Sequence, residues 1–340
     1  MRLPAFLLLL LCLPAVASAA PRYRLTDLGP VAYGDAPAIN SRSEVALTAP
    51  TARGKGFVAA TVISPRRVCL WRAGRRTSLG TLPGYGSTIG GVLNDRGEVA
   101  GTLDQTTDGA AMLTDEHAFL WSRGRLEDIS DYPVTQVRAM NNRGQIVGSG
   151  TNSGRPVSDD PQEIKPYAFL YSGGRMTDLG WGVAQAINDR GQVSGVDDQG
   201  NAVIWERGKA KVLSGVRAGR EIIGRALVND RGQVAVSNGQ AVYLWASGRA
   251  VALPLPPGAF DAEVDAISDT GDVVGAAQVG GKTDYHALLW RRGRVCDLNA
   301  SLPSKSGWLL ERATGINRRG RIVGLGEWHG QPHGFLLTPR

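Results

Sequence analysis

The feature that most constrains this chain is a short turn motif that recurs seven times. In its clearest form, at Ala186–Val193, it reads Ala-Ile-Asn-Asp-Arg-Gly-Gln-Val, which predicts a strand, a tight turn and a second strand. The copies begin at Asn40, Asn94, Asn141, Asn188, Asn229, Ser268 and Asn317. Successive copies lie 54, 47, 47, 41, 39 and 49 residues apart. A period of this length indicates an array of supersecondary units.

Each unit adds two more short strands to this hairpin. The third strand is rich in β-branched, aromatic and leucine residues and often ends in Leu-Trp, as at Ala118–Trp121. A glycine turn such as Ser122–Arg125 follows it. The fourth strand often ends in Asp-Leu-Gly, as at Thr26–Gly29 and Thr177–Gly180. No segment has sustained helical periodicity, so the expected fold is all-β.

Four short antiparallel strands repeated seven times are typical of a seven-bladed β-propeller with four-stranded blades. The chain begins with a strand of the fourth type, Tyr23–Leu28, and ends with one of the third type, Gly334–Leu337. These two strand types are neighbours within a unit. We therefore expect the N-terminal strand to pair with the C-terminal strands and close the ring, which would remove the exposed edges of an open array.

Loop lengths predict which end of the ring binds a ligand. In an up-and-down blade the first and third turns share one face, and the second turn and the crossover share the other. We call these the short-turn face and the long-loop face. The long irregular segments all belong to the second: Ala49–Arg67, Gly80–Gly91, Thr102–His117, Ser149–Tyr167, Gly215–Arg225, Leu255–Val264 and Asn299–Thr314. Long loops on a rigid scaffold are where binding usually resides.

Residues 1–19 have the pattern of a cleaved signal peptide. Arg2 provides the positive start, Leu3–Leu13 is an apolar run too short to span a bilayer, and Ala17–Ala19 matches a cleavage site. We expect residues 20–340 to form a single secreted or periplasmic propeller domain. No later stretch is long and apolar enough to be a transmembrane segment after signal removal.

The net charge and the cysteine content limit which partners and which disulfides we expect. The formal net charge is +7, but the arginines are scattered through the turns, so we expect no nucleic-acid partner and a monomeric chain. Two cysteines, Cys69 and Cys296, follow the signal peptide. A chain of this length can bury its own core without disulfides, so we expect two buried thiols.

The repeated Asn-Asp-Arg-Gly-Gln-Val turn, the following His-Ala-Phe-Leu-Trp strand and the Asp-Leu-Gly ending resemble the HAF repeat family of exported bacterial proteins. The defining tripeptide is complete at His117–Phe119 and altered at Tyr167–Phe169, His286–Leu288 and His333–Phe335. The resemblance covers nearly the whole mature chain. It implies export and a repeated β fold, and it carries over no enzymatic activity.

The repeat slot that gives the motif its name holds three histidines, His117, His286 and His333. Equivalent positions fall in different blades, so we expect each histidine to bond a neighbouring backbone and not to share a metal ion. The Asn-turn lacks the alternating oxygen ligands of a calcium loop. The sequence therefore predicts no metal site and no cofactor.

The usual catalytic motifs are missing from the sequence: it has no G-x-S-x-G elbow, H-E-x-x-H helix, phosphate-binding P-loop or C-x-x-C pair. We assign no catalytic residue. Carboxylates in the loops could pair as the acid and nucleophile of a glycosidase. They are Asp104, Asp108, Glu116, Asp115, Asp159, Asp160 and Glu263. Ordinary surface charge is the alternative explanation for each of them.

Candidate binding residues are the aromatic and basic side chains of the long-loop face. Five tryptophans of the repeat slot are expected to pack within blades. The candidates outside that slot are Trp181, Trp308, Trp328, Tyr85, Arg53, Lys55, Arg66 and Arg67. Aromatic rings of this kind could stack on a sugar or anchor a protein partner.

Two functions remain open from the sequence. The first is an exported, non-enzymatic binding or scaffolding propeller whose ligand is a polysaccharide or an envelope protein. The alternative is a carbohydrate-active hydrolase or lyase that uses loop carboxylates. A third reading, a purely mechanical surface repeat, predicts no saturable ligand.

Overall fold

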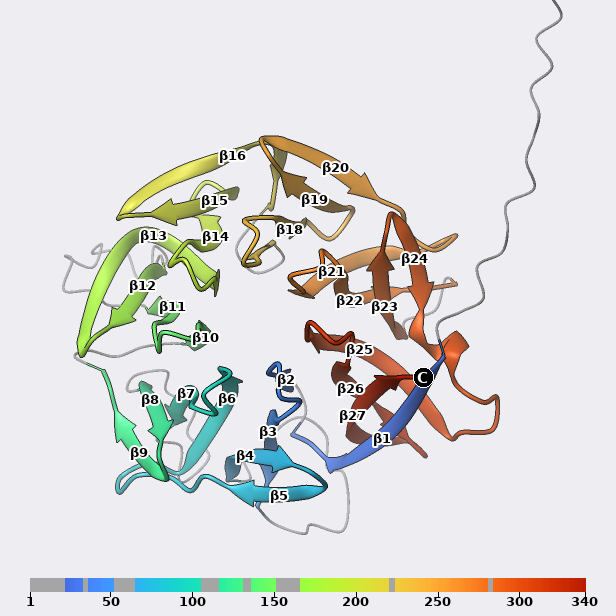
Figure 1. Ribbon diagram of the computed structural model, residues 1–340, viewed down its shortest axis with the longest axis horizontal. Coiled ribbons are helices and arrows are strands. Elements are labelled where there is room, and N and C mark those ends of the chain that lie inside the picture. Colours follow the sequence, from blue (N-terminus) through green and yellow to red (C-terminus); the bar gives the residue numbers. More distant parts are fainter. Residues whose placement is uncertain are drawn as a thin grey trace, which may run out of the picture.

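The computed structural model of the chain describes residues 22–32, 36–51, 65–104, 116–130, 136–150, 166–219, 224–280 and 284–340. Across these residues the regular structure is strand, apart from one short 3-10 helix, η1 (Leu298–Ser301). The strands surround a central opening, and the first strand lies beside the last (Figure 1). The all-β prediction is confirmed, and none of the described helices has the length and apolar character needed to cross a bilayer.

The described strands form six hydrogen-bonded sheets, five with four strands and one with seven. The first two four-stranded sheets are β2 (Ala38–Ile39), β3 (Val45–Pro50), β4 (Arg66–Arg72), β5 (Arg75–Ser78), and β6 (Ser87–Leu93), β7 (Val99–Asp104), β8 (His117–Ser122), β9 (Arg125–Asp128). The next two are β17 (Arg225–Val228), β18 (Val234–Ser237), β19 (Val242–Ala246), β20 (Arg249–Leu253), and β21 (Phe260–Ile267), β22 (Val273–Gln278), β23 (Tyr285–Arg291), β24 (Arg294–Asp297).

The seven-stranded sheet differs from the expected four-stranded pattern because one strand serves two neighbours. Its members are β10 (Gln136–Met140), β11 (Ile146–Gly150), β12 (Tyr167–Ser172), β13 (Arg175–Ile187), β14 (Val193–Asp197), β15 (Asn201–Glu206) and β16 (Lys209–Arg217). The first half of β13, as far as Trp181, pairs with β12, and the half from Gly182 onward pairs with β14. The crossover between two repeat units is thus itself extended, and no break separates the units.

The remaining sheet joins the two ends of the chain. Its order is β1 (Tyr23–Pro30), β27 (Gln331–Pro339), β26 (Ile322–Trp328) and β25 (Trp308–Ile316). The antiparallel pairing of β1 with β27 runs from Tyr23 opposite Pro339 to Pro30 opposite His333. The pairing of the N-terminal strand with the C-terminal strands, which the phase of the repeat predicted, is present.

The apolar core of the described residues is divided into seven clusters that lie between neighbouring sheets or sheet halves. One cluster joins the beginning of the chain to its end: Val45 and Leu47 of β3 pack with Leu28 of β1 and with Val323 and Leu336 of the C-terminal strands. Burying these side chains stabilises the contact between the last and first sheets, because each would otherwise expose apolar surface to water.

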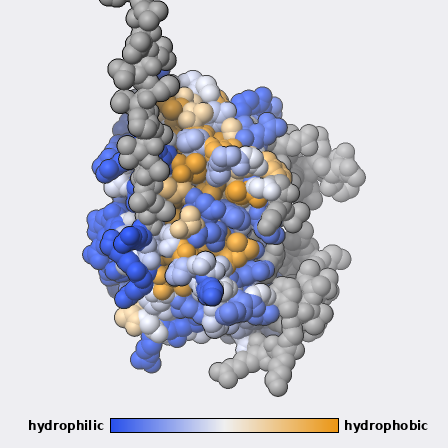
Figure 2. Space-filling model, turned by 90° about the vertical axis from the view of Figure 1, so that its right-hand side faces the viewer, coloured by the Kyte–Doolittle hydropathy of each residue, from blue (hydrophilic) through white to orange (hydrophobic). Residues whose placement is uncertain are grey.

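The outer wall of the ring is more polar at one end than in its middle. Figure 2 shows hydrophilic residues gathered toward the left of the side view and hydrophobic residues among them in the centre. The cysteines are both free, with Cys69 buried and Cys296 half-buried. The expectation of two buried thiols therefore holds for Cys69 only, because Cys296 lies on the outermost strand β24.

The inner strands extend further than the sequence pattern predicted. Parts of the segments Gly80–Gly91, Leu255–Val264 and Asn299–Thr314 were expected to be irregular, but β6, β21 and β25 already begin within them. The parts of β6 and β25 that lie in these segments include Gly90, Glu311 and Arg312, which line the axial channel, so apolar and polar residues do not alternate cleanly there.

Glycines on the second strands shape these inner strands. In five units the inner strand carries an extra residue opposite a glycine of the second strand: Gly101, Gly148, Gly195, Gly275 and Gly324. A Cβ on any of them would clash with a backbone carbonyl of the inner strand. The glycine therefore admits the β-bulge, and the bulge redirects the extra side chain toward the axis. In the unit with Val236 at this position, the β17–β18 pairing has no bulge.

Candidate functional site in the axial channel

The short-turn mouth of the axis is held by the repeated asparagines. In five of the turns the asparagine side chain accepts hydrogen bonds from the backbone N–H groups two and four residues later. Asn188, for example, accepts from Arg190 (3.1 Å) and Gln192 (3.0 Å). Its amide nitrogen donates to the carbonyl of the equivalent residue in the next copy, here Asn229 at 3.0 Å. One buried amide thus shapes its own turn and ties it to the neighbouring one.

These links continue around the axis. Asparagine amides join copy one to two, two to three, three to four, four to five and five to six at 2.9–3.2 Å. Asn317 of the last copy donates to the carbonyl of Asn40 in the first at 3.0 Å. The sixth copy has Ser268, whose hydroxyl contacts Thr270 and accepts from Asp272 within its own turn, so it is too short to make the same link.

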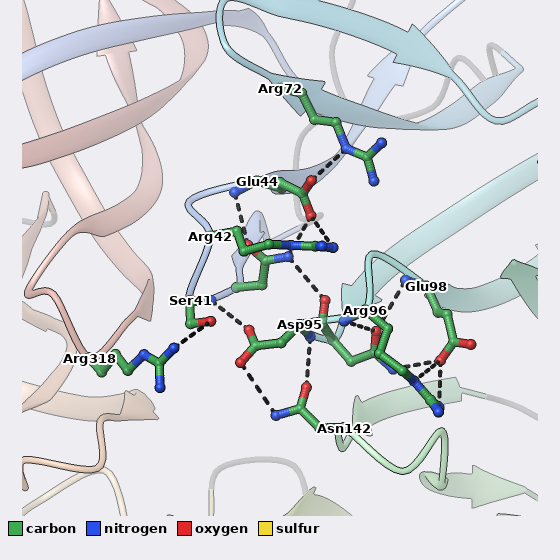
Figure 3. Close-up of polar contacts among 11 residues, drawn as sticks. Ser41, Arg42, Glu44, Arg72, Asp95, Arg96, Glu98, Asn142 and Arg318 are labelled. Carbon is green, nitrogen blue, oxygen red and sulfur yellow. Dashed lines mark hydrogen bonds and ion pairs between the residues drawn. The ribbon is translucent and has the colours of Figure 1, made fainter. Parts of the chain in front are cut away.

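A second set of contacts lies beside the first at the same mouth. The backbone N–H of Ser41 donates to Asp95 at 2.7 Å, and that of Asp95 donates to Asn142 at 2.7 Å, as Figure 3 shows. The same step recurs through Asp189, Asp230 and Asp269. Arg318 holds this position in the last copy and donates to the Ser41 hydroxyl at 3.4 Å.

The cavity at this mouth, about 260 Å³, is therefore lined by polar groups that already bond one another. Burial raises the pKa of Asp230, and the neighbouring Asp189 and Asp269 carboxylates raise it further. Among the described residues no group of three or more His, Cys, Asp or Glu side chains is arranged to hold a metal ion. Since these polar groups already bond one another, the structure of the turns explains why this mouth is polar.

The channel that opens toward the long-loop face is larger and is differently lined. Its cavity is about 570 Å³. Aliphatic side chains such as Val92, Val137 and Leu227 alternate there with charged ones, and Tyr285 is the one aromatic side chain among the described lining residues. A mixed lining with a few polar groups is typical of a ligand site.

Four polar side chains of the channel occupy one position of the repeat, three residues before the turn asparagine or its serine equivalent. Four of the bulges place their extra residue there: Arg138, Gln185, Asp265 and Thr314. Three of these side chains bond the next inner strand. Gln185 donates to Gly224 (2.8 Å) and accepts from Ala226 (2.7 Å), and Thr314 donates to Pro37 (2.5 Å).

The third, Asp265, accepts from Arg312 at 2.7 Å, and Arg312 also pairs with Glu263. Burial raises the pKa of Asp265, whereas the charge of Arg312 lowers it. The two carboxylates raise the pKa of Arg312 against the effect of its burial. The second oxygen of Asp265 is buried and has no hydrogen-bond partner among the described residues.

Arg138 is the exception in this set. Its Nε is buried without a hydrogen-bond partner in the described part of the chain, and no ion pair joins its guanidinium to a described carboxylate. Burial and the nearby charge of Arg225 lower the pKa of Arg138 to about 10. Two guanidinium groups therefore face the same channel from β10 and β17, and like charges in such a position repel each other.

The structure brings together two of the tryptophans that the sequence singled out. Trp308 begins β25 and Trp328 ends β26, and the two are direct cross-strand partners. His333 lies edge-on to Trp308 and tilted against Trp328, at centroid distances of 6.0 and 5.3 Å. Trp328 is 39% exposed. These residues stand at strand ends on the long-loop face and not in loops.

The other candidates do not join this pair. Trp181 lies in β13, and Tyr85 contacts the ring of His117 at 5.8 Å and donates to Asp128 at 3.2 Å. Arg66 and Arg67 begin β4, and Arg67 donates to the carbonyl groups of Arg66 and Gly86. Arg53 and Lys55 lie outside the described residues, as do Asp108, Asp115, Asp159 and Asp160. The predicted residues therefore form no single site.

Two of the loop carboxylates do influence each other. Burial and the Asp104 carboxylate together raise the pKa of Glu116 to about 7, against the opposing charge of Arg66. Asp104 ends β7 and Glu116 directly precedes β8, so both carboxylates lie on the long-loop face.

The histidines of the repeat slot bond carboxylates and not backbone, contrary to the expectation. His117 contacts Asp128 at 2.6 Å, His286 contacts Asp297 at 2.6 Å, and His333 contacts Asp27 at 2.9 Å. Each aspartate belongs to the Asp-Leu-Gly strand, or its variant, beside the histidine strand. The third pair joins β27 to β1, so the N-terminal strand supplies the partner of the C-terminal histidine.

Comparisons with known proteins agree on the fold. No protein-family model and no curated protein matches the sequence. The structure "YCF48 bound to D1 peptide" has a TM-score of 0.54 at 11% identity, over 94% of this chain and 97% of that one. The β-propeller domain of the Trilobed protease from Pyrococcus furiosus has 0.53 at 10% identity, over 93% and 95%.

A third structure, the Pyrococcus horikoshii acylaminoacyl peptidase, has a TM-score of 0.50 at 11% identity, over 94% of this chain and 52% of that one. At these identities the likeness concerns the fold alone. The chain thus shares the β-propeller architecture of proteins with which it has little sequence in common.

Proposed function

We propose that this chain is a non-enzymatic binding module, a seven-bladed propeller whose channel on the long-loop face takes up part of a partner protein. The observation that carries the proposal is the contrast between the two mouths. Polar groups at the short-turn mouth bond one another, whereas in the wider channel the buried Nε of Arg138 has no hydrogen-bond partner among the described residues. Such a group has a cost that a bound ligand can offset.

The blade count rests on three observations. Asparagine amides link the turn copies in cyclic order at six of the seven steps, all except the step from Ser268 to Asn317. Seven apolar clusters lie between neighbouring sheets or sheet halves, and β13 serves two units. Counting the seven-stranded sheet as two blades gives seven. The N-terminal strand is then the outer strand of the last blade, as the β1–β27 pairing requires.

A protein partner suits the channel better than a saccharide does. Sugar sites commonly use aromatic platforms, and the described lining contains one aromatic side chain, Tyr285, whose hydroxyl donates to Asp261. Aliphatic lining residues match the side chains of an extended peptide. YCF48, the structural neighbour bound to a D1 peptide, is a propeller that matches this chain over nearly its whole length, so peptide binding is feasible on this fold.

The test is selection of peptides from a random library by the mature chain, residues 20–340. We expect peptides that bind saturably and compete with one another. Ala36→Trp, at an exposed position that lines the channel, should reduce their affinity at least 10-fold. Ala210→Trp on the outer strand β16 is the matched control and should leave it unchanged. Equal affinities in the two variants would contradict the proposal.

Polysaccharide binding at the Trp308–Trp328 pair is a second candidate, supported by the cross-strand contact and the exposure of Trp328. A glycan array would test it, with Trp328→Ala and Trp205→Tyr as variant and packing control. A hydrolase or lyase that uses Glu116 as an acid is the alternative enzymatic reading, and Glu116→Gln would abolish any turnover it supports.

Export is part of the proposal. The signal-peptide pattern of residues 1–19 and the resemblance to the HAF repeat family favour a periplasmic or secreted protein. N-terminal sequencing of the protein recovered from periplasm and medium should give Ala20 as the first residue. An intact N-terminus on cytoplasmic protein would contradict export.

A further inference from the structure

We infer that Arg138 and Arg225 form a subsite that binds a carboxylate group of the ligand in the axial channel. This inference rests on the proposed binding function and specifies the chemistry of its ligand. It follows from the position of the two side chains, from their lack of hydrogen-bond and ion-pair partners in the described part of the chain, and from the charges around them.

The first step is position. Arg138 is the extra residue of the β10 bulge opposite Gly148, and the bulge turns it toward the axis. Arg225 opens β17, the inner strand of the unbulged unit, and also lines the channel. The two guanidinium groups come from the inner strands on either side of β13, so the ligand would lie at the channel wall against the second half of β13.

The second step is the unmet hydrogen bonding. A guanidinium group has five N–H donors in a planar fork, which matches the two oxygens of a carboxylate. In the described residues neither Arg138 nor Arg225 donates a side-chain hydrogen bond or makes an ion pair, and the Arg138 Nε is buried. The equivalent side chains Gln185, Asp265 and Thr314 all bond protein groups.

The third step is charge. The charge of Arg225 lowers the pKa of Asp265, but Arg312 already pairs with that carboxylate and with Glu263. Glu311 lines the channel from β25, where burial and the charges of Glu327 and Asp284 raise its pKa. The excess positive charge is therefore at the Arg138–Arg225 side. An anionic ligand would relieve the repulsion between the two cations.

A carboxylate can come from a peptide C-terminus or from an Asp or Glu side chain. The experiment separates these sources and also tests the subsite without a peptide. The first arm follows the side-chain Nε–H resonances of ¹⁵N-labelled mature protein, assigned with Arg138→Lys and Arg225→Lys, while acetate or neutral acetamide is added to about 50 mM. We expect saturable shifts of both arginine signals with acetate and none with acetamide.

The second arm uses peptides selected from the library, each made with a free C-terminus, with an amidated C-terminus, and with any acidic side chain replaced by its amide. Removing the recognised carboxylate should lower the affinity about 10- to 100-fold. Arg138→Met and Arg225→Met should lower it by the same factor, and Arg138→Lys by less. Arg249→Met, on the outer strand β20, should not change it.

The outcomes are distinguishable. Peptides that depend on the channel but bind equally well after every carboxylate is removed, with no acetate shift, would overturn the subsite and leave the proposed function standing. A library that selects no peptide would count against the proposed function, while the acetate titration would still decide the subsite. Thermal unfolding of each variant shows whether a loss of affinity reflects a loss of fold.

Discussion

The two ends of the axis are built from the same inner strands but treat their polar groups in opposite ways. At the short-turn mouth, each asparagine bonds its own turn and the next one, and the following residues extend the same pattern. In the channel beyond it, four bulges direct side chains inward, and the buried Nε of Arg138 has no hydrogen-bond partner in the described ranges. The difference teaches that polarity near an axis indicates a ligand only where the hydrogen bonds are not already made.

The largest effect should follow from removing the bulge. In Gly148→Ala the new Cβ would clash with the carbonyl oxygen of Gln136 and lie 2.8 Å from the Phe169 ring, so the backbone must shift. We expect the free energy of unfolding to fall by about 3 kcal/mol or more, the upper end for overpacking. Urea unfolding measures this change.

The control for this substitution is Val236→Ala in the unit without a bulge, where only a small cavity forms and the loss should be about 1–2 kcal/mol. Gly148→Ala should also weaken the carboxylate response of the channel, because Arg138 loses its inward position. An unchanged stability and an unchanged response would show that the glycine does not set the bulge.

The next effect concerns the other mouth. Asn188→Ala removes a buried side chain that makes four hydrogen bonds, two of them to backbone N–H groups of its turn. We expect a loss of about 2–4 kcal/mol in the free energy of unfolding, with peptide affinity in the channel unchanged. Asn238→Ala, whose side chain caps only its own turn, should lose about 1 kcal/mol. If Asn188→Ala kept the stability of the wild-type protein but lost affinity for the peptide, the short-turn mouth and not the channel would be the binding site.

A smaller effect tests the ionisable groups of the long-loop face. The pKa of Glu116 in the folded protein, about 7, lies above its ordinary value of 4.5, so the folded state binds this proton more tightly than the unfolded state does. Stability should therefore fall as pH rises from about 4.5 to about 7 and then stay level.

Because Glu116 keeps some contact with solvent, the fall should be about 1–2 kcal/mol and should be missing in Glu116→Gln. Urea unfolding at pH 5 and pH 8 measures it, with the exposed Glu206→Gln as control. Parallel pH profiles for the wild-type protein and Glu116→Gln would show that Glu116 has no raised pKa.

The smallest effect would complete the short-turn mouth. Ser268→Asn supplies the amide that the sixth copy lacks, and we expect it to bond the carbonyl of Asn317 as its counterparts bond theirs. The gain should be about 0.5–1 kcal/mol, the net value of one hydrogen bond. Asn229→Ser is the reciprocal change and should lose at least as much, because its buried link to Ser268 is broken. If neither substitution changed the free energy of unfolding, these links would shape the mouth without stabilising it.

How much of the site could be predicted depends on which contacts are local. The position of every turn was readable because the asparagine and glycine act within four residues of each other. The binding candidates Trp308 and Trp328 were found as aromatics outside the repeat, but their cross-strand contact depends on strand register. Arg138 and Arg225 were missed because a single inner-strand residue does not show which way it points.

A signal for the channel was nonetheless present. Glycine stands seven residues after the turn residue in the five bulged units, at Gly101, Gly148, Gly195, Gly275 and Gly324, and Leu47 and Val236 stand there in the other two. Reading each of these glycines as a close backbone approach would have marked the residue three before the turn as inward-facing.

The sequence by itself determined the local units, because alternating strands and Asn-x-x-Gly turns are set by interactions a few residues apart. It also determined the order of strands and, through the phase of the first and last elements, which ends pair. Only the tertiary structure decided where the bulges turn side chains and which of those side chains meet a partner, because contacts such as Gln185 with Ala226 and Asp265 with Arg312 join strands about 40 to 50 residues apart. Whether a polar residue is a structural link or a ligand contact is settled by what the neighbouring strand offers it.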